Sequence, residues 1–403
     1  MSTGTLWNRT PDVTLPPLER VQYVKVLFTA DAIGGVWSYA LELARQLSLS
    51  GVEVALATMG SLPTADQRAE AHRIEGLTLW ESRFKLEWMD DPWDDVRRAG
   101  DWLLGLQAKF RADLVHLSDY AHCALAWEVP TLVVGHSCVL SWWEAVKGES
   151  APPAWDRYRQ EVARGLRSAV LVVAPSAAML QALERHYGPL GATRLIPNGR
   201  DPERFRPTRK RPLILAAGRV WDQAKNLAAV ERVAPLLPWP VYIAGELESS
   251  AAVANMPKQA CFLGRLETDE LARWLGRCAV YVHPARYEPF GLSILEAAFA
   301  GSALVLGDIP SLRELWDDAA LFVAPDDHEM LAQTLLGLIA DTSRRLELAH
   351  RSRSRAMSFT AQHMSEAYLA AYRELLGGAS KAGTHRRSQE FRVPSYGSGA
   401  QQS

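Results

Sequence analysis

Short apolar runs recur along this 403-residue chain, and they constrain its fold more than any other feature. Each run is continuous and rich in β-branched residues, which is typical of strands in a parallel sheet that is buried on both faces. The segments between the runs, such as 37–50 and 95–110, carry apolar residues at helical spacing. Alternating strands and helices predict a doubly wound α/β sheet. The first series of predicted strands lies at 23–29, 52–58, 77–80, 114–117, 131–134 and 169–174.

A second series of strands predicts a second domain of the same kind. Between the two series, Pro197-Asn198-Gly199-Arg200-Asp201-Pro202 has the turn chemistry of a linker. The expected fold is therefore α/β with two facing Rossmann-like domains. Ligands of such sheets bind beyond the carboxyl ends of the strands, so the site is expected in the cleft between the domains. The second series lies at 212–217, 241–244, 261–263, 280–283, 303–306 and 321–323.

Composition excludes several classes of protein. The net charge of −2 argues against a generally basic nucleic-acid binder. No apolar run reaches the length of a membrane span, and the first twenty residues lack the apolar core of a signal peptide, so a cytoplasmic location is expected. The cysteines show no zinc spacing and are predicted to be buried thiols in a reducing compartment. They are Cys123, Cys138, Cys261 and Cys278.

No metal site is expected. The one acidic run that imitates such a site contains Asp90, Asp91, Asp94 and Asp95, and tryptophan and proline residues interrupt it. We interpret this run as a loop followed by the start of a helix.

Two glutamates flank the turn that follows the predicted strand 280–283. Glu288 lies in the turn and Glu296 lies within the next, Ala-rich helix. Between them, Phe290-Gly291-Leu292 places a glycine where the first amides of the helix have no intrahelical partner and favour an anion. Such a layout suits a sugar nucleotide, with one carboxylate on each side of a bound diphosphate. The alternative is a turn glutamate and a buried glutamate paired to a base.

Three further groups of residues follow strands that end at the expected cleft. Arg219 and Lys225 leave the first strand of the second series, where a guanidinium and an ammonium group can clamp a diphosphate. Gly34-Gly35 follows the first strand of the chain and permits close approach of a ligand. His136 follows the run 131–134. Each has a structural alternative: solvated surface charges, a tight turn, and a hydrogen-bonded histidine.

Together these residues resemble the retaining, nucleotide-sugar-dependent glycosyltransferases of family 4, which include sucrose-phosphate synthases and bacterial lipopolysaccharide and mannosyl transferases. The resemblance runs from Lys25 to Tyr372. It rests most on the Glu288–Glu296 spacing with Pro-Phe-Gly-Leu inside it, and on Gly218-Arg219 and Lys225-Asn226. Ile196-Pro197-Asn198-Gly199 is similar to the interdomain segment of this family, which has the two-domain GT-B architecture. The segment from Phe359 to Tyr372 is similar to its closing helix.

The resemblance implies a role for each candidate residue. Arg219 and Lys225 would bind the diphosphate, with the amides around Phe290, Gly291 and Leu292. Glu296 would bind the ribose hydroxyls and Glu288 the donor sugar. His136 would lie at the reacting centre, and Gly34 and Gly35 would let the first domain close over the phosphates.

The resemblance and the strand series also divide the chain. The expected parts are a flexible segment at 1–20, an acceptor domain at 21–198, a donor domain at 199–357, a closing helix at 358–376 that crosses back to the first domain, and a disordered tail at 377–403.

The reaction that the resemblance implies is transfer of a hexosyl unit from a nucleotide-diphosphate sugar to an acceptor hydroxyl with retention of configuration. Because a nucleoside diphosphate leaves, stabilising its negative charge is the main catalytic demand. Fixed cations and helix-end amides meet that demand without a metal, so no cofactor is expected beside the co-substrate.

The chain departs from the family pattern at two positions. Ser311 lies near where a glycine is common, and Arg200 stands where an aliphatic residue is usual.

The sequence says less about the acceptor, which is a saccharide, a lipid-linked molecule or a small molecule. Asp119, His122, Trp142 and Trp143 follow strands of the first domain. The tryptophans either stack on a sugar or pack between helices. Four arginines at 155–167 form either a basic face for peripheral contact with an anionic membrane or a solvated helix face.

Three other functions are alternatives to glycosyl transfer. A nucleotide-sugar epimerase on the same fold would need acid and base groups on both faces of the sugar, and no such set is identified. A dinucleotide-dependent dehydrogenase would need GxGxxG, whereas Ser38 stands three positions after Gly35. A non-catalytic sugar-nucleotide sensor would not need every charged contact of the set.

Overall fold

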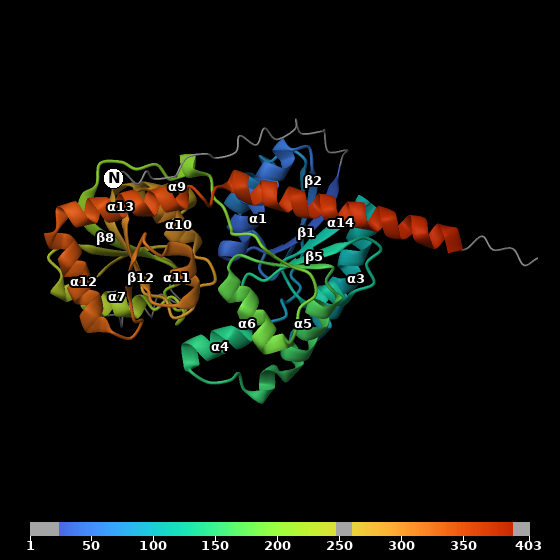
Figure 1. Cartoon of the computed structure of the whole chain (residues 1–403), viewed down its shortest axis with the longest axis horizontal. Coiled ribbons are helices and arrows are strands. Elements are labelled where there is room, and N and C mark those ends of the chain that lie inside the picture. Colours follow the sequence, from blue (N-terminus) through green and yellow to red (C-terminus); the bar gives the residue numbers. More distant parts are fainter. Residues whose placement is uncertain (1–23, 247–259, 390–403) are drawn as a thin grey trace, which may run out of the picture.

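Two parallel sheets, one in each half of the chain, form the framework of the protein (Figure 1). The computed structural model describes residues 24–246 and 260–389, with side chains up to 378. In this part of the chain the N-terminal sheet has seven strands in the order β3-β2-β1-β4-β5-β6-β7. Their bounds are β1 (Lys25–Asp31), β2 (Glu53–Met59), β3 (Leu77–Glu81), β4 (Leu114–Leu117), β5 (Thr131–Val134), β6 (Leu171–Ala174) and β7 (Thr193–Leu195).

The C-terminal sheet has six strands within the described ranges, in the order β10-β9-β8-β11-β12-β13. Both sheets confirm the predicted α/β class with two Rossmann-like domains. The sequence missed only β7, a short edge strand whose Thr-Arg-Leu sequence is no apolar run. The bounds are β8 (Arg211–Ala217), β9 (Val241–Ala244), β10 (Cys261–Gly264), β11 (Cys278–His283), β12 (Ala303–Gly307) and β13 (Leu321–Val323).

Helices cover both faces of each sheet (Figure 1). Around the first sheet lie α1 (Gly35–Leu49), α2 (Ala65–His72), α3 (Trp93–Phe110), α4 (Val139–Lys147), α5 (Asp156–Ser168) and α6 (Ala177–Tyr187), with short 3₁₀ turns η1 (Ala121–Ala124) and η2 (Pro153–Trp155). Around the second lie α7 (Leu227–Val233), α9 (Thr268–Arg277), α10 (Leu292–Phe299), α11 (Pro310–Trp316), α12 (His328–Ala340) and α13 (Thr342–Ala356), with 3₁₀ turns η3 (Pro202–Arg204) and η4 (Ala234–Leu236).

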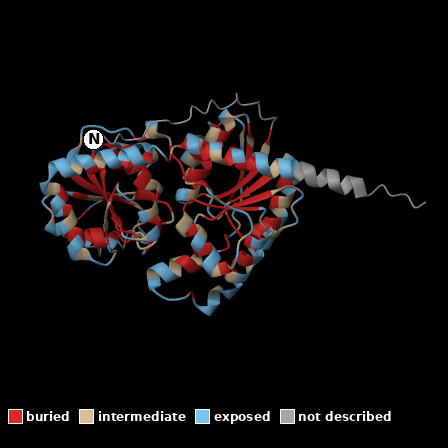
Figure 2. Cartoon of the chain, in the orientation of Figure 1, coloured by how far each residue is buried: buried red, intermediate tan, exposed pale blue. Residues whose placement is uncertain are grey.

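The central strands are buried on both faces, as their continuous apolar runs predict, whereas the edge strands β3, β7 and β10 are partly exposed (Figure 2). Side chains alternate between the faces of a strand. Accordingly Leu27 and Phe28, which are neighbours in β1, belong to different cores. Ile214 and Leu215 of β8 likewise belong to the two separate cores of the second domain. Each domain therefore has its own hydrophobic interior.

The strand order of each sheet reverses at one place, between β1 and β4 in the first domain and between β8 and β11 in the second. At such a switch point the loops after the two central strands diverge to opposite sides and leave a crevice. Gly34 lies in the loop after β1 and Gly35 begins α1, while the loops after β8 and β11 contain Arg219 with Lys225 and Glu288, respectively. The topology thus puts most of the candidate residues at the two crevices.

The chain passes between the domains twice, and the two passages lie side by side. Arg200 donates its backbone N–H to Phe359 O at 3.2 Å, and Ala361 donates to Arg200 O at 2.9 Å. After this crossing, α14 (Ala361–Gln389) packs on α1 of the first domain (Figure 1). There Tyr372 Oη lies 2.6 Å from His116 Nδ1. α14 continues past 376, the predicted end of the closing helix, into the first part of the segment 377–403 that the sequence predicts to be disordered. The segments 1–20 and 390–403 lie outside the described residues.

Of the four cysteines, Cys123, Cys138 and Cys278 are buried free thiols, as predicted. The prediction is wrong for Cys261, which is exposed because it begins the edge strand β10. Asp94 and Asp95 occupy the first turn of α3, which confirms that the acidic run leads into a helix. In the described part of the chain, no helix is long and apolar enough to cross a membrane.

Gly199 is required where the two passages meet. A Cβ at this position would lie 2.3 Å from the backbone oxygen of Thr360. We expect Gly199→Ala to lower the free energy of unfolding by about 1–3 kcal/mol, since the backbone must shift to admit it. Gly105→Ala is the control, because an added Cβ in the exposed part of α3 meets nothing within 4 Å. It should stabilise the protein by about 0.5–1 kcal/mol. Urea unfolding measures the free energy of unfolding of both variants. Equal effects of the two substitutions would contradict the need for glycine at position 199.

Candidate active site

A tight turn joins β11 to α10 and carries Glu288. Ala224 O accepts the backbone N–H of Arg286 at 2.8 Å, which ties this turn to the loop after β8. Gly291 then precedes α10 with φ +88°, a conformation that favours glycine. No side chain caps α10. The amides at the start of this helix therefore lack a capping side chain, which is the arrangement expected of the segment around Phe290, Gly291 and Leu292; their role in binding an anion stays a prediction.

Glu288 lies in a buried cluster with Lys225 and His283. Its Oε2 accepts from Lys225 Nζ at 2.6 Å and lies 3.2 Å from His283 Nε2. Burial alone would raise the pKa of Glu288, but Lys225 and His283 outweigh burial and hold the pKa well below its usual range. Glu288 is thus a fixed anion, which excludes it as a general acid near neutral pH. Sequence reasoning missed His283, although a histidine that ends a buried strand was a signal.

Ser311 supports the same turn. Its hydroxyl donates to the backbone oxygen of Glu288 at 2.6 Å. The departure from glycine at this position therefore has a structural use, which is to hold the turn that carries the carboxylate.

Arg219 extends across the domain boundary toward the turn after β1. Its Nη2 donates to Asp222 at 2.8 Å, which fixes the guanidinium. Its Nη1 lies 3.7 Å from the position of a Cβ on Gly34, and the Leu292 side chain lies 3.5 Å from that of a Cβ on Gly35. The structure therefore brings Arg219, Gly34, Gly35 and Leu292 together from two domains. Asp31, at the end of β1, faces the same guanidinium, and burial raises its pKa to about 6 against the opposing effect of Arg219.

His136 stands apart from this group. It follows β5 and packs edge-on to Tyr39 of α1, with ring centroids 4.5 Å apart. Burial lowers its pKa to about 3, so the imidazole is neutral, and its Nε2 has no hydrogen-bond partner among the described residues. No hydrogen bond of the described chain links it to Arg219, Lys225 or Glu288. Its free nitrogen is the feature that a ligand could use.

Glu296 is not free, contrary to what a simple ribose-binding carboxylate would suggest. Its Oε1 accepts from Arg200 Nε at 2.8 Å, and Arg200 Nη1 donates to Glu42 Oε2 at 3.0 Å. Glu42 belongs to α1 of the first domain and is fully buried. Sequence reasoning missed this triad, although the unusual Arg200 and a glutamate within the apolar helix α1 were its signals.

The two domains also touch around the turn after β11. Tyr287 Oη lies 2.8 Å from Ser141 Oγ and accepts the N–H of Cys138 at 3.2 Å. Ser176 Oγ donates to Pro289 O at 2.8 Å. The candidate turn therefore lies against the starts of α4 and α6 in the first domain.

Glu314 of α11 makes a further contact of this kind. Its two carboxylate oxygens accept the backbone N–H groups of Ala177 and Ala178 at 2.7 and 2.9 Å. A carboxylate of the second domain thus caps helix α6 of the first.

The acceptor candidates are only partly available. Asp119 and His122 are buried and hydrogen-bonded to each other, and Thr29 also donates to Asp119 at 2.9 Å. Trp142 and Trp143 of α4 are half-buried, and Lys147 lies over both rings. Lys147 also donates to Gln223 of the second domain at 2.9 Å, so α4 lies beside the loop that carries Lys225.

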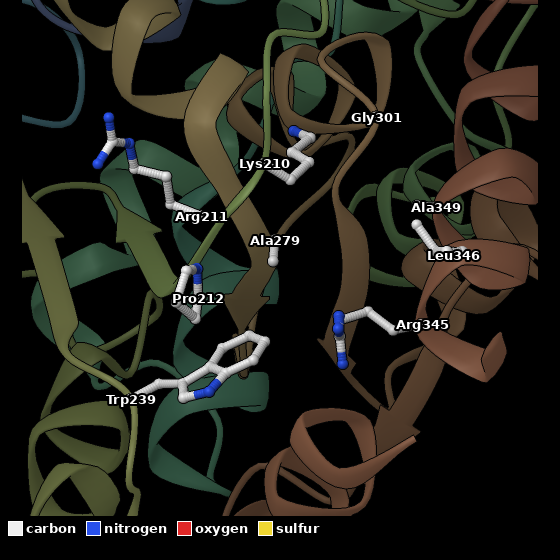
Figure 3. Close-up of a pocket in the computed structure, with 9 residues that line it drawn as sticks. All are labelled: Lys210, Arg211, Pro212, Trp239, Ala279, Gly301, Arg345, Leu346 and Ala349. Carbon is white, nitrogen blue, oxygen red and sulfur yellow. The ribbon is translucent and has the colours of Figure 1, made fainter. Parts of the chain in front are cut away.

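Two other features do not add to the site. The described residues contain no group of three or more His, Cys, Asp and Glu side chains that could hold a metal. A separate pocket of about 190 Å³ lies among Lys210, Arg211, Trp239 and Arg345 (Figure 3). It is below the range of about 300–1,000 Å³ of typical ligand pockets. It also adjoins the beginnings of β8 and β11, opposite the strand ends that carry the candidate site.

Comparisons with known proteins agree with the fold. The family model described as Glycosyltransferase Family 4 matches residues 33–204, and the model described as Glycosyl transferases group 1 matches residues 211–341. The chain is 27% identical to a glycogen synthase of Mycobacterium tuberculosis, over 88% of this chain and 95% of that protein.

Among solved structures, sucrose-phosphate synthase from Thermosynechococcus elongatus matches 88% of this chain and 100% of its own, with a TM-score of 0.76 and 17% identity. HepE from Anabaena in complex with UDP-glucose matches 87% of this chain and 100% of its own, with a TM-score of 0.71 and 16% identity. Fold and matches together define a two-domain glycosyltransferase with the GT-B architecture. The chain belongs to glycosyltransferase family 4, whose members use nucleotide sugars.

The Glu288–Lys225 pair makes a stability prediction. Lys225→Met should lower the free energy of unfolding by about 3–5 kcal/mol at pH 7, because it leaves a buried carboxylate without its cation. The folded-state pKa of Glu288 is depressed, so the stability from this pair is present above the ordinary value of 4.5 and is lost as the pH falls below it. The difference between the variant and the wild type should therefore narrow below about pH 4.5.

The matched control is Lys210→Met. Lys210 Nζ bonds only to Leu275 O and Ser302 Oγ within the described residues, with no carboxylate partner. Its effect on the free energy of unfolding should not change between pH 6 and pH 3. A Lys225→Met effect that is equally constant would refute the pairing.

Asp31 makes the opposite prediction. Its pKa is raised to about 6 in the folded protein from an ordinary 3.8, so folding favours the protonated acid and stability is lost as the pH rises from 3.8 toward 6. Asp31→Asn should therefore be more stable than the wild type at pH 7.5, by about 1–3 kcal/mol, and should show no advantage at pH 3.5. Thermal unfolding across this pH range measures the difference, and an advantage that is independent of pH would contradict the shift.

Proposed function

We propose that this glycosyltransferase moves a hexosyl unit from a nucleoside diphosphate sugar to an acceptor hydroxyl, with retention of anomeric configuration. One observation carries the proposal: the turn after β11 combines an anionic Glu288, a paired Lys225 and an uncapped helix, and lies against Gly34-Gly35 and Arg219 at the domain boundary. In this arrangement the donor sugar meets Glu288 and the diphosphate meets the cations and amides.

Both cations keep donors for phosphate oxygens. Lys225 carries three N–H donors and gives one to Glu288. Arg219 gives Nη2 to Asp222 and points Nη1 toward Gly34. These partners fix the positions of the charges before the donor arrives, which is the arrangement that electrostatic catalysis needs.

The reaction breaks the bond between the anomeric carbon and the diphosphate oxygen and forms a bond to the acceptor oxygen. The electron pair of the broken bond leaves with the nucleoside diphosphate, where Arg219, Lys225 and the α10 amides stabilise it. The acceptor proton passes to the departing phosphate on the same face. Glu296 holds the ribose, and the neutral His136 donates or accepts a hydrogen bond near the sugar. Domain closure excludes water, which would otherwise hydrolyse the donor.

The complex of HepE with UDP-glucose makes a uridine diphosphate sugar the first donor to test. The acceptor is a saccharide, a lipid-linked or a small molecule. Of the four arginines at 155–167, Arg157 packs over Trp93 and Arg164 pairs with Glu161, so these two have partners within the protein.

The decisive experiment incubates the protein with UDP-glucose, ADP-glucose and GDP-mannose, with and without a panel of acceptors. Release of nucleoside diphosphate only with an acceptor supports transfer. Formation of the C2 epimer without acceptor would instead indicate an epimerase, and binding without turnover would indicate a sensor.

The site assignment predicts that Glu296→Ala and Lys225→Ala each lower kcat/KM for the donor by at least about tenfold, a loss of about 1.4 kcal/mol in transition-state binding. Lys210→Ala is the control, since this lysine lies at the opposite ends of the strands. If both site variants keep the fold by circular dichroism and show unchanged donor kinetics, the assignment of Glu296 and Lys225 to the donor site is wrong.

A further inference from the structure

Arg200 occupies an unusual place in the molecule. It lies in the first passage between the domains, and its backbone bonds on both sides to the second passage at Phe359 and Ala361. A parallel bridge with Thr360 completes this crossing. Its backbone is therefore fixed at the point about which the domains would move relative to each other.

Its side chain joins both domains at the same point. The guanidinium donates to Glu296 of the second domain at 2.8 Å and to Glu42 of the first at 3.0 Å. The side chains of Arg200, Glu42 and Glu296 are 4%, 0% and 8% exposed, so all three charges are shielded from water. A shielded guanidinium between two carboxylates fixes the direction of each.

Charge in this triad is not balanced internally. Two carboxylates share one guanidinium. Arg45 lies 3.6 Å from Glu42, and Arg204 acts on Glu296 through its charge without forming an ion pair with it. Burial would lower the pKa of Arg200, but Glu296 and Glu42 outweigh burial and raise it, so the cation is permanent. Among the described residues Arg200 is therefore the one cation that forms an ion pair with Glu296, and burial keeps the pKa of Glu296 raised against the opposing effects of Arg200 and Arg204.

Arg200 also leaves half of Glu296 available. It takes Oε1, and no described residue donates a hydrogen bond to Oε2. A carboxylate that is held by one oxygen presents the other in a fixed direction. Hydroxyl groups of a ligand can meet that oxygen without reorganising the side chain.

We propose that Arg200 is a positioning residue for donor recognition. Its hydrogen bond orients the Glu296 carboxylate toward the ribose hydroxyls, and its hydrogen bond to Glu42 makes this orientation depend on the position of the N-terminal domain. The inference rests on the proposed function, which assigns the ribose to Glu296. It extends that function to a residue that touches no part of the donor.

The test compares ribose recognition with overall affinity. UDP, ADP and GDP and the 2′-deoxy form of each are titrated into the full-length protein by calorimetry. A site built to bond a hydroxyl rejects the ligand that lacks it, so the wild type should bind the 2′-deoxy form of its best nucleotide at least about tenfold more weakly. Arg200→Leu should reduce the ratio of the two affinities to below about threefold, because the Glu296 carboxylate is no longer held in one orientation.

Arg204→Leu is the matched control. Arg204 also lies between the domains and also joins them, through Glu70 of the first domain and Asp269 of the second. Arg204 forms no ion pair or hydrogen bond with Glu296 among the described residues, so it acts on this carboxylate through charge alone and does not fix its orientation. Its loss should leave the ratio of the two affinities unchanged, even if the domain contact weakens.

A second variant guards against failure to fold. Arg200→Leu combined with Glu42→Gln removes one buried anion together with the cation and should show the same loss of ribose discrimination. Absence of nucleotide binding in the wild type would overturn the proposed function and the inference together. Binding with unchanged discrimination in the Arg200 variants would overturn the inference alone, as would tighter ribonucleotide binding, which would make Arg200 a competitor of the donor.

Discussion

Every carboxylate that the candidate donor site uses is buried, and each needs a cation beside it. Glu288 has Lys225, and Glu296 has Arg200, which it shares with Glu42. An isolated carboxylate in such surroundings would take up a proton or destabilise the fold. The positions of these cations then decide where the remaining hydrogen-bonding capacity points. The site is therefore a set of ion pairs in which each charged group keeps a hydrogen-bonding atom for the donor.

The fold followed from the sequence because its signal is local. Continuous apolar runs such as 131–134 predict buried parallel strands, and two series of them predict two domains with little dependence on tertiary context. Turn glycines such as Gly291 were readable for the same reason, since a positive φ is a requirement of a single residue. The edge strand β7 was missed because an exposed strand needs no apolar run.

The pairing of charges was not readable from the sequence. Glu42 and Glu296 are 254 positions apart, and although a glutamate within an apolar helix indicates a buried partner, it does not indicate that one guanidinium joins the two. Arg200 was noticed only as a departure from the family pattern, without a role. The same holds for Tyr287, whose hydroxyl meets Ser141 on the other domain. Contacts between domains depend on the relative placement of two independently folded units, which periodicity and spacing do not encode.

The capping of α6 by Glu314 has a consequence for motion. The first amides of a helix have no partners within the helix, and here Glu314 provides partners for Ala177 and Ala178 from the other domain. Separation of the domains would return these two N–H groups to solvent and take a negative charge away from the positive end of the helix dipole. Protection of these two amides against hydrogen exchange should therefore report the fraction of time for which the two domains are in contact.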